Sequence, residues 1–279
     1  MKITLIQTHL HWENREKNLS HFDNLINSVN EQTDLIVLPE MFTTGFTMNP
    51  KQFAENDNVT LEWLKQKAKQ KNAVITGSVA INDSNNYFNR LFWVEPNQNF
   101  ATYDKRHLFR MAKEDENYTA GTKKIIMQIQ EWNICPLICY DLRFPIWSRN
   151  KFTDISYKLS EAYTQTANFT RPITSGWEYD VLIYVANWPE IRNFPWKQLL
   201  IARAIENQCY VIGLNRIGLD GNNFSHSGDS MVINPRGEII SKTKANEESI
   251  ETILLDKTYL TDFRKAFPVG LDADSFTII

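Results

Sequence analysis

Short apolar runs rich in β-branched residues recur along the chain and predict buried strands. The runs cover residues 3–6, 35–38, 74–79, 91–94, 134–138, 181–185 and 211–214, with a shorter strand-like run at 101–103. Between several of them, polar and apolar positions follow a helical period, at about residues 16–29, 60–70 and 196–206. Alternating strands and helices indicate an α/β fold in which helices cover a sheet.

Two further segments refine this outline. The turn sequence Asn-Pro-Arg-Gly predicts a hairpin with strands at residues 230–234 and 238–241. Residues 151–176 are rich in Thr, Ser, Tyr and Asn, and we expect one helix near 155–163 with loop elsewhere. Because no linker rich in Gly, Pro or Ser interrupts the chain, we expect one domain over residues 1–279 with an insertion at about 151–176.

The composition limits the class of partner. Hydrophobic residues make up 42% of the 279 positions, enough for a sizeable core without a metal or disulfide. The net charge is −3, and acidic and basic residues are interspersed along the chain. No basic stripe is present to attract a phosphate backbone, so nucleic acid is not an expected partner. The longest apolar run, residues 181–186, is far shorter than the roughly 20 residues of a membrane span, so no membrane is expected either. Three cysteines, an odd number, fit a cytosolic protein with a thiol available for chemistry.

Cys139 stands where an apolar run ends and a polar loop begins. Ligands bind at the strand ends of α/β sheets, so this thiol is a candidate nucleophile, and a buried structural cysteine is the open alternative. Cys135 and Cys209 lie deeper in apolar runs and are interpreted as structural. No second pair of ligands accompanies Cys135 and Cys139 at zinc-binding spacing, so no metal or other cofactor is expected.

Glu40 and Lys105 are two charged residues that also follow strand-like runs. A carboxylate beside apolar Met41 and Phe42 would be poorly solvated, which suits a general base. Taken alone, an exposed loop carboxylate and a solvated lysine are the favoured interpretations.

Three motifs occur in order: Leu-Pro-Glu-Met-Phe at 38–42, Tyr-x-Lys-x-His-Leu-Phe at 103–109 and Cys-Tyr-Asp-Leu-Arg-Phe-Pro at 139–145. Together they resemble the nitrilase superfamily of carbon–nitrogen hydrolases. Further matching segments lie at 202–207, 228–230 and 234–238, so the resemblance covers nearly the whole chain. It implies an αββα sandwich, usually paired as αββααββα, so a homodimer is expected.

By this resemblance Glu40 is the general base, Lys105 the cation that stabilises the oxyanion, and Cys139 the nucleophile. These roles agree with general chemistry, because a neighbouring base or lysine increases the thiolate character of a cysteine. The negative oxygen formed by attack on an amide would be held by Lys105 and by the backbone N–H of Tyr140.

The family also has a second active-site carboxylate, which positions substrate and assists the lysine. It lies shortly before an Ala-Gly pair, and counting back from Gly121 selects Glu114. Glu116 is the alternative, and a solvated acidic loop is the interpretation without the family.

Arg143 follows the thiol by four residues and is a candidate to bind a substrate carboxylate through its guanidinium fork. The alternative is a structural ion pair with the region of Asp141 or Glu178. Asn187 and Trp188, after the run at 181–186, are expected to shape the pocket wall. None of the histidines has a triad role: His9, His11, His21, His107 and His226.

Within the superfamily, Trp-Pro after Val-Ala-Asn at 185–189 and the ending at 267–276 look most like the bacterial omega-amidase branch. This resemblance implies hydrolysis of the terminal amide of a small 2-oxo dicarboxylic acid monoamide through a cysteine thioester. The alternatives are another carbon–nitrogen hydrolase, acting on an N-carbamoyl amine, an aliphatic amide or a nitrile, or a catalytically silent binding module. The insertion at 151–176 departs from the family pattern, and we expect it to form a lid or rim over the site.

Overall fold

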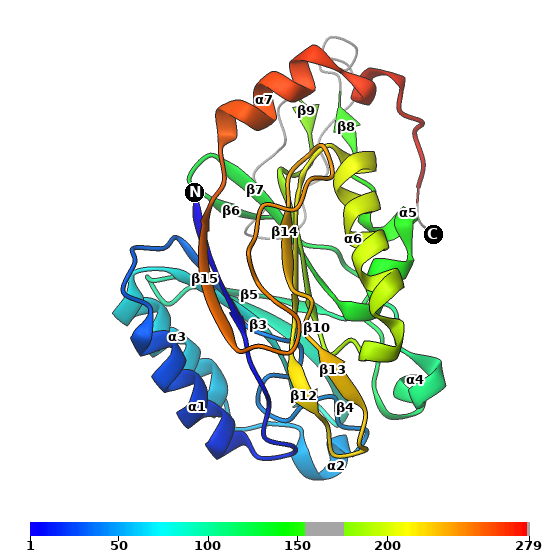
Figure 1. The fold of residues 1–279 in the computed structure, drawn as a ribbon. Helices are drawn as coiled ribbons and strands as arrows, with labels where there is room; N and C mark the ends of the chain where they lie inside the picture. Colours follow the sequence, from blue (N-terminus) through cyan, green and yellow to red (C-terminus); the bar gives the residue numbers. More distant parts are fainter. Residues whose placement is uncertain (154–175, 278–279) are drawn as a thin grey trace.

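The computed structural model describes residues 1–153 and 176–277 and contains two large sheets packed face to face (Figure 1). The six-stranded sheet has the order β15 (Ser249–Leu254), β1 (Lys2–Gln7), β2 (Leu35–Val37), β3 (Val74–Asp83), β4 (Asn86–Val94) and β5 (Phe100–Asp104). The five-stranded sheet has the order β14 (Met231–Ile233), β11 (Tyr210–Asn215), β10 (Val181–Ala186), β7 (Trp132–Ile138) and β6 (Met127–Ile129).

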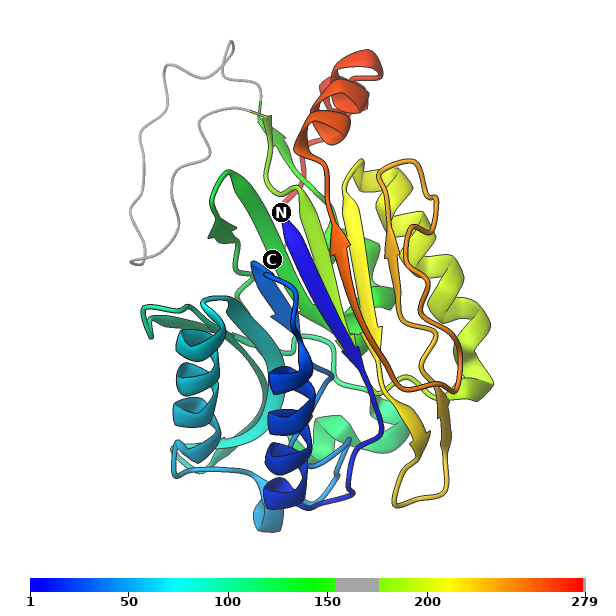
Figure 2. The same cartoon turned by 60° about the vertical axis from the view of Figure 1, so that its left-hand side comes forward.

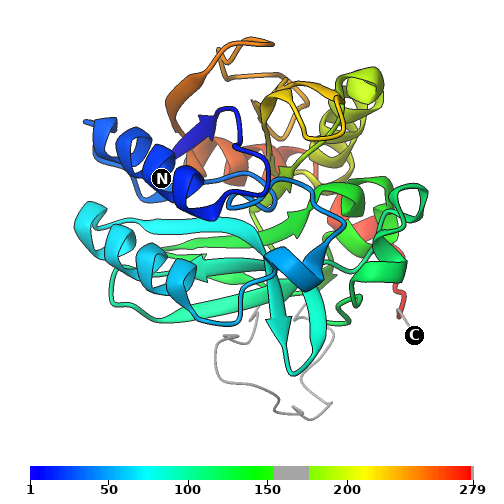
Figure 3. The same cartoon turned by 90° about the horizontal axis from the view of Figure 1, so that it is seen from below.

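Helices cover the outer face of each sheet, so the layers are αββα as expected (Figure 2). α1 (Arg15–Ser28) and α3 (Val59–Lys71) lie on the six-stranded sheet, and α6 (Asn193–Asn207) lies on the five-stranded sheet (Figures 2 and 3). Shorter helices complete the fold: α2 (Pro50–Phe53), α4 (Glu114–Asn117), α5 (Pro145–Ser148) and α7 (Lys257–Ala266). No described helix is long and apolar enough to cross a membrane.

The first sheet is buried on both faces, which explains its continuous apolar runs. Side chains alternate along a strand, so Ile3 and Leu5 enter the core between the sheets whereas Ile6 packs under α1 and α3. In the same way Leu35 and Val37 face the central core and Ile36 faces the helices. The strands of this sheet are apolar at successive positions because one face packs into the core between the sheets and the other into the core under the helices.

The parallel strands bring the polar residues at their carboxyl ends to one edge of the sheet. β7, β10 and β11 run parallel, and Cys139, Asn187 and Asn215 stand at or directly after their carboxyl ends. β2 lies between parallel neighbours in the other sheet and leads to Glu40. The topology thus brings chemically active residues from both sheets to one edge.

Most predicted elements are confirmed, and the differences include the hairpin and elements that the sequence did not predict, among them β6, α7 and β15. The hairpin is only partly formed: β14 and the turn are present, but the residues after it make an isolated bridge between Ile233 and Ile239. This segment then turns toward β15, where the Glu251 carboxylate accepts the backbone N–H of Lys242 at 2.8 Å. The sequence did not predict strand β15, whose residues are mostly half-buried at the sheet edge.

The ends of the insertion pair as a small ribbon of β8 (Phe152–Thr153) and β9 (Gly176–Trp177). This ribbon, labelled near the top of Figure 1, precedes the amino end of β10. Cys139 follows the carboxyl end of the parallel neighbour β7, so ribbon and thiol lie at opposite ends of the sheet. The helix expected at 155–163 lies outside the described residues, and so does the course of the expected lid. The position of the ribbon gives the lid hypothesis no support.

Candidate active site

Glu40 is fully buried at the edge where the two sheets meet. Asn187 binds it twice, with its backbone N–H 2.8 Å from Oε2 and its side-chain amide donating to the Glu40 carbonyl. The next residue, Met41, has a positive φ of 42°, and its N–H donates to Ser78 Oγ at 2.8 Å. The backbone is therefore bent directly after Glu40, whose carboxylate and carbonyl are both held by Asn187 from the other sheet.

Lys105 follows β5 and reaches the same place with 1% exposure. Its Nζ lies 2.8 Å from Glu40 Oε1 and 3.0 Å from each oxygen of Glu114. Burial disfavours the ammonium, but the negative charges of Glu114 and Glu40 outweigh it and raise the pKa of Lys105 above its ordinary value. The lysine is thus a permanent cation held between two carboxylates.

Glu114 rather than Glu116 occupies the second carboxylate position. Glu114 is fully buried and accepts the backbone N–H of Phe109 at 2.6 Å, whereas the Glu116 side chain is 65% exposed and lies 3.9 Å from Lys113. Burial raises the pKa of Glu114, and Lys105 partly offsets this effect. The positive charge of Lys105 is therefore the charge that compensates both buried carboxylates, Glu40 and Glu114.

Asn89 is a site residue that sequence reasoning missed. Its amide donates to Glu40 Oε1 at 2.8 Å and to Glu114 Oε1 at 3.3 Å, and its own oxygen accepts from Ser78 Oγ at 2.8 Å. It shares a face of β4 with apolar residues that enter the central core. A polar residue on the apolar face of a strand was the available signal.

Cys139 begins a 3₁₀ helix, Cys139–Arg143, with a positive φ of 43°. A residue other than glycine pays about 1–3 kcal/mol for this conformation, which persists only where the surroundings impose it. Burial and the Glu40 carboxylate raise the pKa of the Cys139 thiol well above its usual value, against the opposing effect of Lys105. The resting side chain is therefore a thiol with a carboxylate beside it.

Asp141 holds the turn that carries the thiol. Its buried carboxylate accepts the Tyr103 hydroxyl at 2.7 Å, the Ile138 N–H at 3.1 Å and the His107 N–H at 3.0 Å. The His107 ring also lies 2.7 Å from the same carboxylate and stacks on Phe144 at 3.8 Å. His107 thus packs against Phe144, and it also helps to position the nucleophile turn.

A cavity of about 190 Å³ opens onto Cys139 and Lys105. It is small beside the roughly 300–1,000 Å³ of pockets for drug-sized ligands, so it suits a small substrate. Asn187 and Trp188 line it as expected, and Tyr140, whose N–H lies in the first turn of the 3₁₀ helix and so has no partner within it, lines it too.

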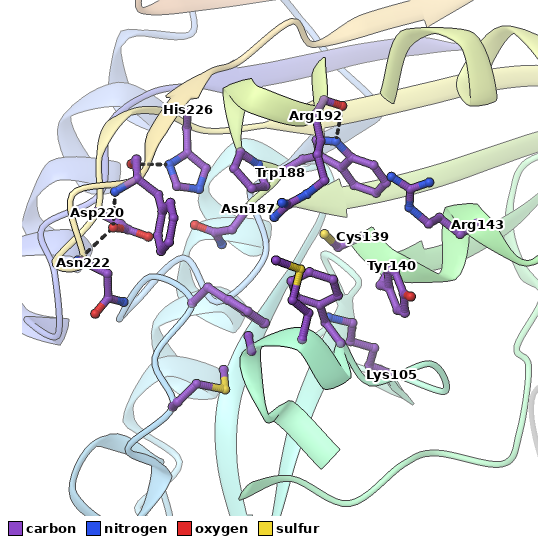
Figure 4. Close-up of a pocket in the computed structure, with 17 residues that line it drawn as sticks. Lys105, Cys139, Tyr140, Arg143, Asn187, Trp188, Arg192, Asp220, Asn222 and His226 are labelled. Atoms are coloured by element: carbon purple, nitrogen blue, oxygen red, sulfur yellow. Dashed lines mark hydrogen bonds between the residues drawn. The ribbon is translucent and has the colours of Figure 1, made fainter. Parts of the chain in front are cut away.

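Two guanidinium groups line this cavity (Figure 4). Arg143 lies over the Trp188 ring at 5.1 Å, and Arg192, which the sequence analysis missed, lies over the Phe109 ring at 5.3 Å. Within the described part of the chain Arg143 makes no ion pair with Asp141 or with any other acid. Figure 4 shows both groups on the Trp188 side of the Cys139 sulfur, with Lys105 on the other side.

The remaining thiols lie apart from this cavity. Cys135 and Cys209 are fully buried and free, and they belong to the central core. Burial raises the pKa of Cys135 to about 12 and that of Cys209 further. Neither thiol faces the carboxylates or the lysine of the site.

The chain belongs to the carbon–nitrogen hydrolase family, whose model matches residues 2–265. It is 43% identical to the omega-amidase YafV of Escherichia coli K12, over 100% of this chain and 98% of the relative. It is 31% identical to the 2-oxoglutaramate amidase of Bacillus subtilis 168, over 96% and 95%. XC1258 from Xanthomonas campestris, a CN-hydrolase superfamily protein with an arsenic adduct in its active site, superposes with a TM-score of 0.91 at 37% identity, covering 100% and 99%. The resemblance inferred from the motifs and the expected sandwich are confirmed.

Proposed function

We propose that this protein hydrolyses the terminal amide of a small 2-oxo dicarboxylic acid monoamide and releases ammonia. The observation that carries the proposal is a buried thiol beside Glu40 and Lys105, at the base of a small cavity that also exposes two guanidinium groups. Relatives that are an omega-amidase and a 2-oxoglutaramate amidase support this substrate class. Burying two carboxylates and an ammonium costs desolvation free energy. A catalytically silent binding module would have no need of such a cluster.

The first step is attack by sulfur on the amide carbon. Because Cys139 is protonated at rest, Glu40 accepts the thiol proton as the carbon–sulfur bond forms. The carbonyl π electrons move to oxygen, where the Lys105 ammonium and the Tyr140 N–H stabilise the negative charge. Losing one such donor typically costs about 10²–10³ in rate.

The second step breaks the carbon–nitrogen bond. Protonated Glu40 gives its proton to the departing nitrogen, and ammonia leaves a thioester on Cys139. Glu40, again a carboxylate, then takes a proton from water as the water oxygen attacks the thioester carbon. The carbon–sulfur bond breaks, the new carboxylic acid departs, and the thiol regains its proton, so one amide and one water give one acid and one ammonia.

Arg143 and Arg192 give the site a reason to prefer a charged substrate. An amide offers no charge to bind, so a short substrate must be oriented by its other end. A guanidinium group can bind a carboxylate with two parallel hydrogen bonds. We infer that these two residues bind the carboxylate of the 2-oxo acid, with the amide directed at Cys139.

Ammonia release from a substrate panel tests the proposal. The panel contains 2-oxoglutaramate, an uncharged aliphatic amide of similar length, an N-carbamoyl amine and a nitrile. Arg143→Met and Arg192→Met should each lower kcat/KM for 2-oxoglutaramate by about 10–100-fold, the loss of a charge-assisted hydrogen bond, and spare the uncharged amide. For Arg143→Lys, kcat/KM for 2-oxoglutaramate should lie between the values of the unaltered protein and of Arg143→Met.

The matched control is Arg106→Met, because Arg106 also stacks on a tryptophan, Trp147 at 4.4 Å, but lies outside the cavity. Equal turnover of charged and uncharged amides by the unaltered protein would refute the substrate class. Preference for the carbamoyl compound or the nitrile would select one of the alternative hydrolases. A protein that hydrolyses nothing and forms no acyl adduct detectable by mass spectrometry would be the binding module.

We also propose that the protein is a cytosolic homodimer. Three free cysteines support a reducing compartment. Large apolar side chains are exposed on the neighbouring helices α5 and α6, including Ile146 at 63% and Ile205 at 53%, and such surfaces mark protein contacts. Light scattering should give twice the chain mass, and Ile205→Glu should halve it.

A further inference from the structure

Three histidines and a glutamate meet on the surface beside the end of β1, away from the active-site cavity. His9 and His11 follow β1, His21 lies on α1, and Glu248 precedes β15. The ring centroids are 4.4 Å apart for His9 and His21 and 5.1 Å apart for His9 and His11. Three separate parts of the chain therefore bring imidazoles and a carboxylate together where the catalytic reaction does not use them.

The spacing of the donor atoms is specific. His9 Nδ1 and His21 Nε2 each lie 3.6 Å from the same oxygen, Glu248 Oε2, and all three atoms lie within 4.8 Å of one another. A separation of 3.6 Å is too long for a hydrogen bond. Ligand bonds of about 2.0–2.2 Å in tetrahedral geometry would place ligand atoms about 3.3–3.6 Å apart. Two of the three separations thus match those of ligand atoms around a small divalent cation, and the third, between His9 Nδ1 and His21 Nε2, is within 4.8 Å.

We propose that His9, His21 and Glu248 bind one divalent transition-metal ion of the Zn²⁺ or Ni²⁺ class, with the ring centroid of His11 5.1 Å from that of His9 and 5.8 Å from that of His21. Imidazole donors favour such ions over Ca²⁺ and Mg²⁺, which prefer oxygen. A bound ion would join the end of β1, helix α1 and the segment before β15. Its role is structural, since none of its ligands lines the catalytic cavity.

Thr8 supplies both support and a competing explanation. Its hydroxyl donates to Glu248 Oε2 and lies 2.7 Å from His21 Nε2. In the metal-bound form this hydroxyl would orient the carboxylate, as groups hydrogen-bonded to metal ligands do. In the competing explanation, the same residues form only a hydrogen-bonded relay from His21 through Thr8 to Glu248. The two explanations differ in whether added metal binds and stabilises the protein.

The test is calorimetric titration of Zn²⁺ into EDTA-treated, dialysed full-length protein, with thermal unfolding measured alongside. We expect one ion per chain and a Tm that rises with Zn²⁺, because an ion that binds only the folded state stabilises it. His9→Ala and Glu248→Gln should each weaken binding at least about 10-fold and abolish the Tm rise. Glu247→Gln, which removes a neighbouring exposed carboxylate, is the matched control and should bind as the unaltered protein does.

Visible and near-ultraviolet absorption with Co²⁺ separates this site from the catalytic thiol. Imidazole and carboxylate ligation gives ligand-field bands without the thiolate-to-metal charge transfer that binding at Cys139 would produce. We expect ligand-field bands alone in the unaltered protein and their loss in His9→Ala. The proposal is overturned by the absence of saturable binding, by equal affinity in His9→Ala and the unaltered protein, or by a charge-transfer band. Without added metal, His9→Ala and Glu248→Gln should each unfold within a few degrees of the Tm of the metal-free unaltered protein.

Discussion

Replacing Glu40 by glutamine should stop hydrolysis and yet make Cys139 easier to ionise. Burial raises the pKa of the Cys139 thiol, and the negative charge of Glu40 raises it further. Glutamine removes the charge but keeps an oxygen for Lys105 and Asn89, which now donate to a carboxylate oxygen at 2.8 Å each. The variant therefore loses its base, and Lys105 and the more weakly acting Glu114 are the charges that remain near the sulfur.

The expected magnitude follows from the contact. An adjacent charge shifts a pKa by about 1–3 units, and each unit is a tenfold change in thiolate population below the pKa. The thiolate fraction of Cys139 at a fixed neutral pH should thus rise about 10–10³-fold. Turnover should instead fall by about 10²–10⁴, the usual contribution of a general base.

The assay is the pH dependence of alkylation of Cys139 by iodoacetamide, followed by mass spectrometry. The midpoint should move to lower pH in Glu40→Gln and by a smaller step in Glu114→Gln, since Glu114 is a weaker cause of the raised pKa. Lys105→Met should move it to higher pH. A midpoint in Glu40→Gln that equals or exceeds that of the unaltered protein would refute this electrostatic reasoning. Cys139→Ala supplies the background from other thiols.

Three further predictions concern single residues. Cys139→Ala should abolish ammonia release and leave the thermal transition nearly unchanged, whereas Cys135→Ala and Cys209→Ala should stay active, as measured by ammonia assay and calorimetry. Asn89→Ala should lower kcat by about 10²-fold through misplaced carboxylates, and the free energy of unfolding in urea by about 1–3 kcal/mol. Asp141→Asn should destabilise the protein by about 2–3 kcal/mol in urea, because charge-assisted bonds to the nucleophile turn are lost.

The parts of the site that could be predicted from sequence are those that follow strands. A buried strand produces a recognisable apolar run, and a charged or nucleophilic residue directly after it must lie at the sheet edge. Glu40, Lys105 and Cys139 all satisfy this condition, so the local pattern made them candidates, and the three motifs together separated them from structural or solvated residues. The family motif then added Glu114, which no local pattern distinguishes from Glu116.

The parts that were missed depend on contacts between distant segments. Asn89 matters because β4 carries it between two carboxylates from other elements, and Arg192 matters because a 3₁₀ turn, Glu190–Arg192, carries it to the cavity. Strand β15 exists because β1 offers an unpaired edge, since its own residues lack a buried strand's pattern. The approach of His9 to Glu248 likewise has no local signature.

The ionic cluster explains how one site can hold a reactive thiol without leaving it reactive at rest. Two carboxylates and one ammonium are buried together, and burial and the surplus negative charge both raise the pKa of Cys139 and favour its protonated form. Thiolates are the form that oxidants and alkylating agents attack, so a protonated Cys139 is protected between turnovers. When an amide enters, the charge that leaves sulfur appears on the substrate oxygen, where Lys105 can stabilise it, and the proton has only to reach Glu40. The sulfur thus becomes nucleophilic only when a substrate oxygen is present to accept the charge. The fold must therefore preserve the positions of Lys105 and Glu40 relative to each other.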